Sequence, residues 1–349
     1  MFYSKAGGGH LATAEAIAEQ IMEMDKKIQV VLYDGLERTN FGLKVNPSKG
    51  YLVISNYLLP LFNLFYFLSN NFIGVKILRQ TIRLSWGRSF KRIIETENPH
   101  LIATTHHFIT PSTISKELTQ PFVTVVTDLG KPHRIWFDHK SNTVITPTLE
   151  MAEFAQKSLN LKTDQLIPLG YPLKKGFNVK PKAVLNNTLL ILGGGSGSGN
   201  LKKQAKTVCK HFPDKKIVAV CGYNQKLLKD LKKLNLSNLE LHGFTDQMAE
   251  LIASSDMVIT KAGPAAIMEA ASMQKPLIIS GWVGLQEKDN VDFVLKNKLG
   301  VYCPNINKLP KCIEDMYSHY NKYSQSGKNI QSNTQNIAKY IIDLMAKTV

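Results

Sequence analysis

The sequence predicts an α/β protein built from two doubly wound, Rossmann-like domains. Its 349 residues exceed what one ordinary hydrophobic core organises. Short β-branched runs alternate with helix-like segments in both halves, as buried parallel strands alternate with crossover helices. A glycine-rich turn stands near the start of each half, at residues 7–9 and 193–199. Together these features predict two parallel sheets, each with helices on its faces.

The first half predicts a domain over residues 1–170. Residues 12–24 have helical periodicity, and residues 28–36 have the composition of a buried strand. Three further β-branched runs, at 100–107, 122–128 and 142–148, predict parallel strands, and Thr148 is a suitable cap for the helix that follows. Residues 1–4 are short for a central strand, so we expect the first strand to be incomplete.

The second half predicts a linker, a second domain and a tail. Prolines, glycines and charges mark the linker at 171–187, and strand–helix alternation restarts over 188–325. In the tail, 326–349, apolar residues recur at helical spacing, so we expect a helix that packs back on the first domain. Ligands of parallel sheets bind at the carboxyl ends of the strands. This outline fits dehydrogenases, kinases and GT-B glycosyltransferases alike.

Charge and cysteine content narrow the classes of partner. The formal net charge is +16, which favours nucleic acid, an acidic lipid surface or a phosphorylated ligand. The four cysteines lie far apart with no CxxC, which predicts reduced thiols rather than a zinc site. Residues 1–20 lack the apolar core of a signal peptide, and we expect no transmembrane helix.

The glycine loop at 193–199 predicts a phosphate site. It follows a strand and precedes a helix, so backbone N–H groups face a bound anion. No Gly-Lys-Ser/Thr follows, which excludes a Walker A motif. The next strand ends in Cys221-Gly222-Tyr223 rather than in an acidic residue, which argues against a dinucleotide. A tight turn without a ligand is the alternative.

Two further motifs lie downstream of this loop. Lys261, Gly263 and Pro264 end a strand and open a helix that carries Glu269. Polar groups then cluster in the segment 284–294, where they suit recognition of vicinal hydroxyls; they are Gln286, Glu287 and Asn290. An ordinary solvated helix residue is the alternative for Glu269, and a capping arrangement is the alternative for the second cluster.

The order of these motifs resembles a known family. The motifs are GGGH..A..AI at 7–17, VVTDL…H..WF at 125–137, LGYP at 169–172, GGGSGSG, HGFTDQM at 242–248, TKAGP..I.EA at 260–270, and QE..N. This set is similar to that of monogalactosyldiacylglycerol synthases and processive diacylglycerol glucosyltransferases, which are related to the lipid II N-acetylglucosaminyl transferase. The resemblance implies the GT-B fold, with two domains facing across a cleft. It also implies a UDP-hexose:1,2-diacylglycerol 3-beta-glycosyltransferase that inverts the anomeric carbon.

The resemblance assigns roles in the second domain. The UDP-sugar, galactose or glucose, is a substrate, so no cofactor is implied. Backbone around Phe244 would contact uracil, Glu269 would accept hydrogen bonds from the ribose, and Gln286 and Glu287 would contact the sugar with Asn290 in support. The diphosphate would lie against the loop and the following turn, at Gly194, Gly195, Ser196, Lys261 and Gly263.

The resemblance also assigns roles in the first domain. Gly8 and Gly9 form the acceptor-side turn, His10 is the expected base, and Asp128 is a second base or an orienting partner. The alternative is that His10 only caps or packs against the turn. No metal is expected, because adjacent histidines on a strand, such as His106 and His107, point to opposite faces.

Residues 57–94 are the segment that we predict to contact a membrane. An apolar run at 57–68 precedes a basic segment with interleaved aromatics, and Arg79, Arg83 and Trp86 are predicted to face the acceptor membrane. The alternative is a core helix with a solvated charged face. No motif supports nucleic-acid binding. We therefore expect a peripheral protein on the cytoplasmic face of a membrane. The alternative functions are N-acetylglucosamine transfer to a polyprenyl-linked acceptor and a non-catalytic UDP-sugar sensor.

Overall fold

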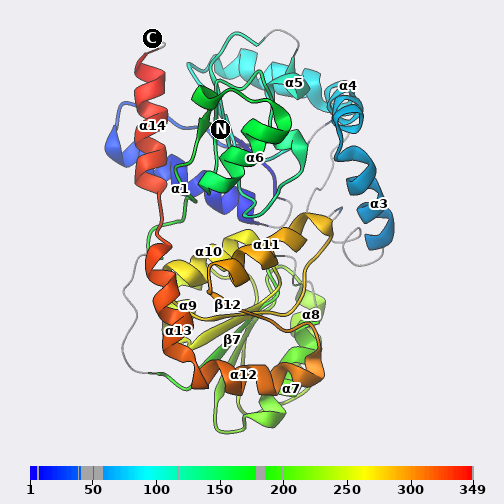
Figure 1. The fold of residues 1–349 in the computed structure, drawn as a ribbon, viewed down its shortest axis with the longest axis vertical. Helices are drawn as coiled ribbons and strands as arrows, with labels where there is room; N and C mark the ends of the chain where they lie inside the picture. Colours follow the sequence, from blue (N-terminus) through cyan, green and yellow to red (C-terminus); the bar gives the residue numbers. More distant parts are fainter. Residues whose placement is uncertain are drawn as a thin grey trace. The chain divides into compact units, whose positions relative to one another are not determined.

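The computed structural model describes residues 1–5, 8–37, 39–40, 50, 58–115, 118–177, 185–195, 197 and 200–347. The chain divides into two compact units (Figure 1). Unit 1 comprises Met1–Lys174 and Asn333–Val349, and unit 2 comprises Lys175–Ser332. Residues 326–332, which the sequence assigned to the tail, therefore belong to unit 2. Ser196, Gly7, Tyr57 and part of the predicted linker, 178–184, lie outside the described residues.

Unit 1 is a parallel sheet with helices on both faces, in the strand order β2-β1-β3-β4-β5-β6. Its strands are β1 (Phe2–Tyr3), β2 (Tyr33–Asp34), β3 (Ile102–Thr104), β4 (Phe122–Val125), β5 (Thr143–Ile145) and β6 (Leu166–Ile167). Its helices are α1 (Gly9–Met24), α3 (Leu59–Ser69), α4 (Phe72–Glu97), α5 (Pro111–Ile114), η1 (Arg134–Trp136), α6 (Leu149–Leu159), η2 (Thr163–Gln165) and α14 (Thr334–Ala346).

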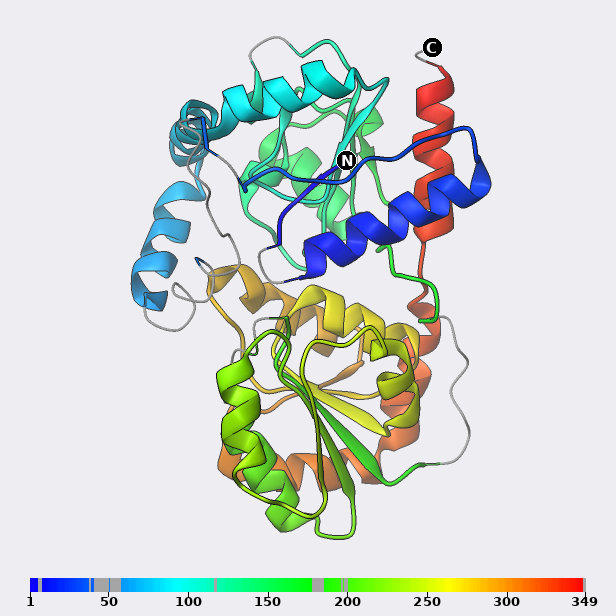
Figure 2. The ribbon, with the colours of Figure 1, turned by 180° about the vertical axis from the view of Figure 1, so that it is seen from behind.

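Side-chain alternation along the strands of unit 1 builds a core on each face. Ile102 and Phe122 join the cluster under α4, whereas Ala103 and Val123 join the cluster under α1 and α14. The packing of α14 against unit 1 confirms the predicted docking of the tail, with Ile337 and Ile341 buried (Figure 2).

Two expectations about the first strands need correction. The strand predicted at 28–36 is reduced to β2, which is half-buried because it is the edge strand of the sheet. The short start of the chain nevertheless forms a central strand. β1 pairs with both β2 and β3, and Phe2 is buried against Phe90.

Unit 2 has the strand order β12-β11-β10-β7-β8-β9. Its strands are β7 (Thr188–Leu192), β8 (Lys216–Val220), β9 (Leu239–His242), β10 (Met257–Thr260), β11 (Leu277–Ile279) and β12 (Gly300–Tyr302). Its helices are α7 (Leu201–His211), α8 (Gln225–Lys232), α9 (Met248–Ser254), α10 (Pro264–Ser272), α11 (Leu285–Lys296), η3 (Ile306–Lys308), α12 (Leu309–Ser318), α13 (Tyr320–Ser326) and η4 (Gly327–Asn329).

The strand orders fix where ligands are expected in each unit. In chain order, the sheet of unit 2 is 3-2-1-4-5-6, which is the dinucleotide-fold order, and it reverses between β7 and β10. The sheet of unit 1 is 2-1-3-4-5-6 and reverses between β1 and β3. Open α/β sheets bind ligands at the carboxyl ends of the strands beside this reversal. Of the predicted site residues, His10 follows β1, the glycine loop follows β7, and Lys261 follows β10.

Candidate active site

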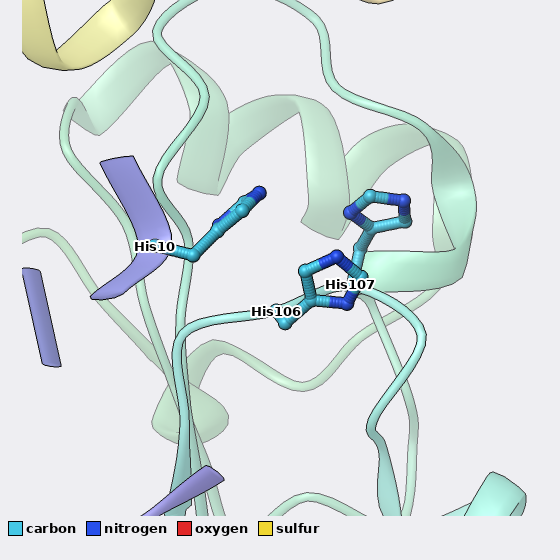
Figure 3. Close-up of side chains that lie close together, drawn as sticks. All are labelled: His10, His106 and His107. Atoms are coloured by element: carbon cyan, nitrogen blue, oxygen red, sulfur yellow. The ribbon is translucent and has the colours of Figure 1, made fainter. Parts of the chain in front are cut away.

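Three histidines meet at the strand reversal of unit 1. His10 lies in the first turn of α1, after β1, and His106 and His107 follow β3 (Figure 3). The His10 ring lies 4.6 Å from the His106 ring and 6.1 Å from the His107 ring, measured between centroids. The left-handed backbone of Gly8, with φ 85°, caps α1 and turns the chain from strand to helix.

The position of His106 and His107 contradicts the prediction that they point to opposite faces. Their rings stack at 4.4 Å with an interplanar angle of 22° (Figure 3). The reason is that β3 ends at Thr104, so both residues lie in a turn beyond the strand. Strand alternation does not apply in a turn, and both rings lie beside His10.

Hydrogen bonds fix the tautomer of His10. Its Nδ1 lies 2.7 Å from the carbonyl oxygen of Thr105 and 3.0 Å from Oγ1 of Thr127. Because a carbonyl oxygen only accepts, Nδ1 carries the proton and Nε2 keeps its lone pair. The hydroxyl of Thr105 in turn donates to the backbone oxygen of His10 at 2.8 Å. His10 is thus held as a neutral imidazole whose basic nitrogen is Nε2.

Burial keeps the whole cluster uncharged. It lowers the pKa of His10 to about 4, and the hydrogen bond to Thr105 opposes this shift only in part. The pKa values of His106 and His107 are well below the usual range, first because of burial and then because of the neighbouring histidines. These three side chains are therefore neutral imidazoles at neutral pH.

Neutral imidazoles are also metal ligands, so the three histidines could together hold a metal ion. One ring nitrogen from each histidine lies within 4.8 Å of the others. His10 fits, because metal-binding histidines commonly donate their second N–H to a carbonyl. His106 fits poorly, because its Nδ1 accepts the amide N–H of Phe108 at 3.2 Å and its Nε2 therefore carries the proton. An ion at this cluster would also occupy Nε2 of His10.

Asp128 is linked to the histidines through Trp136. Its Oδ2 accepts from the indole Nε1 of Trp136 at 2.8 Å. Trp136 is fully buried, and its ring lies 6.2 Å from the His10 ring and 5.5 Å from the His107 ring. This geometry fits the predicted role of Asp128 as an orienting residue, which acts here through Trp136.

The glycine loop of unit 2 has backbone conformations that require glycine. Gly194 and Gly197 have φ of 64° and 58°, and the amide of Gly197 donates to the carbonyl of Gly194 at 3.0 Å. The loop packs on the turn after β8, where Gly222 has φ 57°. The amide of Tyr223 donates to Gly195 at 2.9 Å. The predicted phosphate loop is therefore built from two glycine turns in backbone contact.

Lys261 lies at the strand reversal of unit 2. Its Cε would lie 3.1 Å from a Cβ on Gly194, and its Nζ would lie 3.6 Å from one on Gly263. The ammonium group forms an ion pair with Glu287, whose side chain is 6% exposed. The other oxygen of Glu287 accepts the amide of Val283 at 2.8 Å, at the start of α11. The charge of Lys261 is thus placed beside the glycine loop.

The remaining donor-site predictions divide between buried and accessible groups. Asn290 is fully buried and donates to the carbonyl of Ala262 at 2.9 Å, so it fixes the turn after β10, and its predicted support of Gln286 and Glu287 at a sugar stays a prediction. Gln286 and Glu269 are half-buried on α11 and α10. Phe244 is 54% exposed and stacks on Tyr223 at 4.3 Å. The sequence analysis did not identify Tyr223 as a partner for Phe244.

The structure corrects the predicted membrane residues of α4. The Arg79 guanidinium turns inward and donates to the carbonyl oxygen of Phe137 at 2.8 Å, so it does not face a membrane. Trp86 packs against the core cluster around Phe90 and is half-buried, so part of its ring is committed to the core of unit 1. Arg83 is half-buried and donates to Gln80. Exposed apolar side chains, which suit a membrane surface, lie instead on α3.

Two family models match the chain in succession. Residues 10–173 match monogalactosyldiacylglycerol (MGDG) synthase, and residues 188–341 match the glycosyltransferase family 28 C-terminal domain. The first half of the chain is thus similar to MGDG synthases, and the second half is similar to the C-terminal domain of family 28 glycosyltransferases. Monogalactosyldiacylglycerol synthase 1 of Arabidopsis thaliana is 29% identical over 91% of the chain, and the spinach enzyme (Spinacia oleracea) is 27% identical over 97%. The chain spans 64% of the length of the Arabidopsis protein.

Solved structures show the same fold at low identity. MurG of Acinetobacter baumannii has a TM-score of 0.57 at 12% identity, covering 99% of each chain. The UDP complex of Staphylococcus aureus MnaA has a TM-score of 0.64 at 13% identity, covering 100% of this chain and 96% of its own. A UDP-GlcNAc 2-epimerase from Neisseria meningitidis has 0.60 at 15%, covering 96% and 97%. These likenesses confirm the GT-B fold class. At such low identity they do not identify a reaction, which must be argued from the residues of the site.

Proposed function

We propose that the chain transfers a hexose, galactose or glucose, from a UDP-sugar to diacylglycerol at a membrane surface. The observation that carries this proposal is His10, a neutral imidazole with Nδ1–H on Thr105 and a lone pair on Nε2. A neutral histidine that keeps a lone pair on Nε2 has the state that a general base needs. The family match supports lipid glycosyl transfer, since its characterised relatives carry the name of a galactolipid synthase.

The proposed reaction is a single displacement that inverts the anomeric carbon. The hydroxyl oxygen of diacylglycerol forms a bond to the anomeric carbon, and the bond from that carbon to the UDP oxygen breaks. The hydroxyl proton passes to Nε2 of His10, and the electron pair leaves with UDP. Unit 1 then supplies the base, and Asp128 holds the adjacent indole of Trp136 in place.

Unit 2 is proposed to hold the donor and stabilise the leaving group. Backbone N–H groups of the glycine loop and the cation of Lys261 lie at the strand reversal, where a diphosphate is expected. The ion pair with Glu287 fixes the position of that cation. The exposed stack of Phe244 on Tyr223 gives the uracil a flat apolar surface next to the same sheet edge. No metal is required in this scheme.

Helix α3 supports a peripheral membrane location. It carries no charged residue, and among its eleven residues only Ser69 is buried. A helix that is apolar all round is normally buried in a protein or in lipid. The large apolar side chains exposed along α3 and the adjoining part of α4 are Leu61, Leu64, Phe65, Phe67, Leu68, Phe72, Ile73 and Ile77. We call this set the α3–α4 apolar surface and propose a lipid bilayer as its occupant.

Charge on α4 agrees with an acidic bilayer on the cytoplasmic side. Lys76, Arg88, Lys91 and Arg92 are exposed along the helix that follows the apolar surface. Within the part of the chain that the structure describes, no single helix has the length and composition needed to cross a bilayer. The pair α3 and α4, bent by 110°, passes that test only when the two are taken together.

The test is transfer from labelled UDP-galactose or UDP-glucose to diacylglycerol in anionic vesicles, with lipid products resolved by thin-layer chromatography. We expect a monoglycosyl lipid from one donor. His10→Asn keeps a donor for Thr105 but lacks the basic nitrogen, so it should abolish transfer and leave UDP binding unchanged. His139→Asn, at an exposed position in unit 1, is the matched control. UDP binding without any product would instead indicate a sensor or another acceptor, including a polyprenyl-linked one.

A further inference from the structure

The turn between α3 and α4 is bonded directly to the segment that carries Trp136. Oγ of Ser69 lies 3.1 Å from Nε2 of His133. Because Nδ1 of His133 accepts the amide N–H of Ile135, Nε2 carries the proton and donates to Ser69. The side-chain oxygen of Asn70 accepts the amide of Arg134 at 2.8 Å. The ring of Tyr66 lies edge-on to His133 at 4.9 Å.

Helix α4 holds the same segment from the other end. Nη2 of Arg79 donates to the carbonyl oxygens of Phe137 and Ile135 at 2.8 and 3.3 Å. Its Nε lies 4.0 Å from Asp138, which is itself fixed by the amide and hydroxyl of Ser112. The backbone of η1 is therefore bonded at both ends to the helices that bear the α3–α4 apolar surface.

The last residue of η1 lies beside the candidate catalytic residues. Trp136, the last residue of η1, binds Asp128 through its indole N–H and lies beside the rings of His10 and His107. A three-residue helix has little freedom to absorb a displacement of its backbone. A displacement of the α3–α4 turn is therefore passed to Trp136, and so to Asp128 and His10.

Helix α3 is bonded to the η1 segment at this turn. Ser69 is its only buried residue, whereas its other apolar side chains are exposed to a considerable degree. Seating these side chains in a bilayer is favourable by the apolar area removed from water. That free energy acts on a helix whose buried end is bonded to His133. The bonds between the turn and η1 are thus the route by which membrane contact reaches the site.

We propose that the α3–α4 turn couples membrane docking to the placement of Trp136 and Asp128, with His133 and Ser69 as positioning residues. The coupling rests on the proposed function for the membrane contact of the α3–α4 apolar surface and for its activity readout. It predicts that a bilayer increases the rate of transfer by more than its presentation of the diacylglycerol acceptor accounts for. It also predicts that breaking the Ser69–His133 bond removes the stimulation without removing vesicle binding.

The experiment compares the wild-type chain with Ser69→Ala and His133→Ala in three measurements. These are vesicle binding by sedimentation, transfer to diacylglycerol in vesicles, and transfer to a dispersed short-chain diacylglycerol. Thr81→Ala, which removes an exposed hydroxyl bonded only to its own helix, is the control. We expect kcat on vesicles to fall about fivefold in the two variants, the size of one net hydrogen bond. Vesicle binding and transfer to the dispersed acceptor should stay near wild type.

A second readout needs no catalysis. Vesicles should slow amide hydrogen exchange over residues 133–137 in the wild-type chain and in Thr81→Ala, but not in Ser69→Ala. Equal loss of transfer on both acceptors would reduce His133 to a structural residue, and unchanged stimulation in both variants would refute the coupling. If no chain shows transfer, the proposed function fails, and the exchange measurement still decides the coupling.

Discussion

Gly222→Ala is expected to disable the donor site by displacing the glycine loop. A Cβ at this position would lie 2.4 Å from the carbonyl oxygen of Gly195 and 2.5 Å from that of Gly194. Ordinary contact begins at 3.4 Å, so the backbone must move by about 1.0 Å, the difference between 3.4 and 2.4 Å. The left-handed backbone costs an L-residue about 1–2 kcal/mol. Loss of the bond from Tyr223 to Gly195 costs about 1 kcal/mol more.

These terms predict that unit 2 is destabilised by about 2–3 kcal/mol, which lowers its melting temperature by roughly 5–10 °C. The displaced N–H groups should weaken UDP binding at least about tenfold. Calorimetry measures both quantities. Gly243→Ala is the matched control, since its Cβ would meet nothing closer than 3.7 Å and its φ is not in the left-handed region. The reasoning fails if Gly222→Ala binds UDP like the wild-type chain, or if the control loses as much.

Three further predictions concern unit 1. Burial lowers the folded-state pKa values of His10 and His133 to about 4, so as pH falls below about 6.5 the unfolded chain binds protons before the folded chain does. The free energy of unfolding should therefore decrease from pH 6.5 towards pH 4. Denaturant unfolding at stepped pH measures this, and a free energy of unfolding that does not change with pH would contradict it. Added Zn²⁺ should inhibit transfer by occupying Nε2 of His10, whereas EDTA should leave the rate of transfer unchanged. Loss of transfer in EDTA would show that a metal is needed. Phe67→Ser with Phe72→Ser should weaken vesicle binding by about tenfold per residue, because each ring is more than two-thirds exposed and free to enter lipid. Leu149→Ser, which changes an exposed leucine on α6, should bind vesicles normally.

The sequence was sufficient for elements whose pattern is local. A buried parallel strand is visible in the sequence as an apolar run, and a tight turn is visible as consecutive glycines. The two sheets and their carboxyl edges were therefore predictable. The periodicity of 334–347 also predicted α14 and its docking. The residue at which a strand ends was not predictable. Whether His106 and His107 alternate or stack depends on β3 stopping at Thr104, and nothing in the residue types fixes that point.

Pairings between distant segments were the other limit. Lys261 and Glu287 were both identified, but their ion pair depends on the strand order that places β10 beside the start of α11. Arg79 was assigned to a membrane face because basic residues near aromatic ones suit that surface. Its actual partners are backbone carbonyls of η1, and backbone acceptors carry no signal in a sequence.

The low basicity of His10 bears on the order of events in the proposed transfer. A base with a pKa of about 4 cannot remove a proton from an alcohol before the reaction begins. The hydroxyl becomes strongly acidic only once its oxygen has begun to bond to the anomeric carbon. Proton transfer to His10 is then late and downhill, and the departure of UDP limits the rate.

Late proton transfer makes two measurable predictions. The activity per folded molecule should persist below pH 6 and decline only as His10 protonates near pH 4. The solvent deuterium isotope effect on kcat should be close to unity, because the proton does not move in the slow step. An acid limb at the ordinary histidine pKa of about 6.5, together with a large isotope effect, would instead show that His10 acts early. In that case substrate binding must raise the pKa of His10 above its value in the free protein.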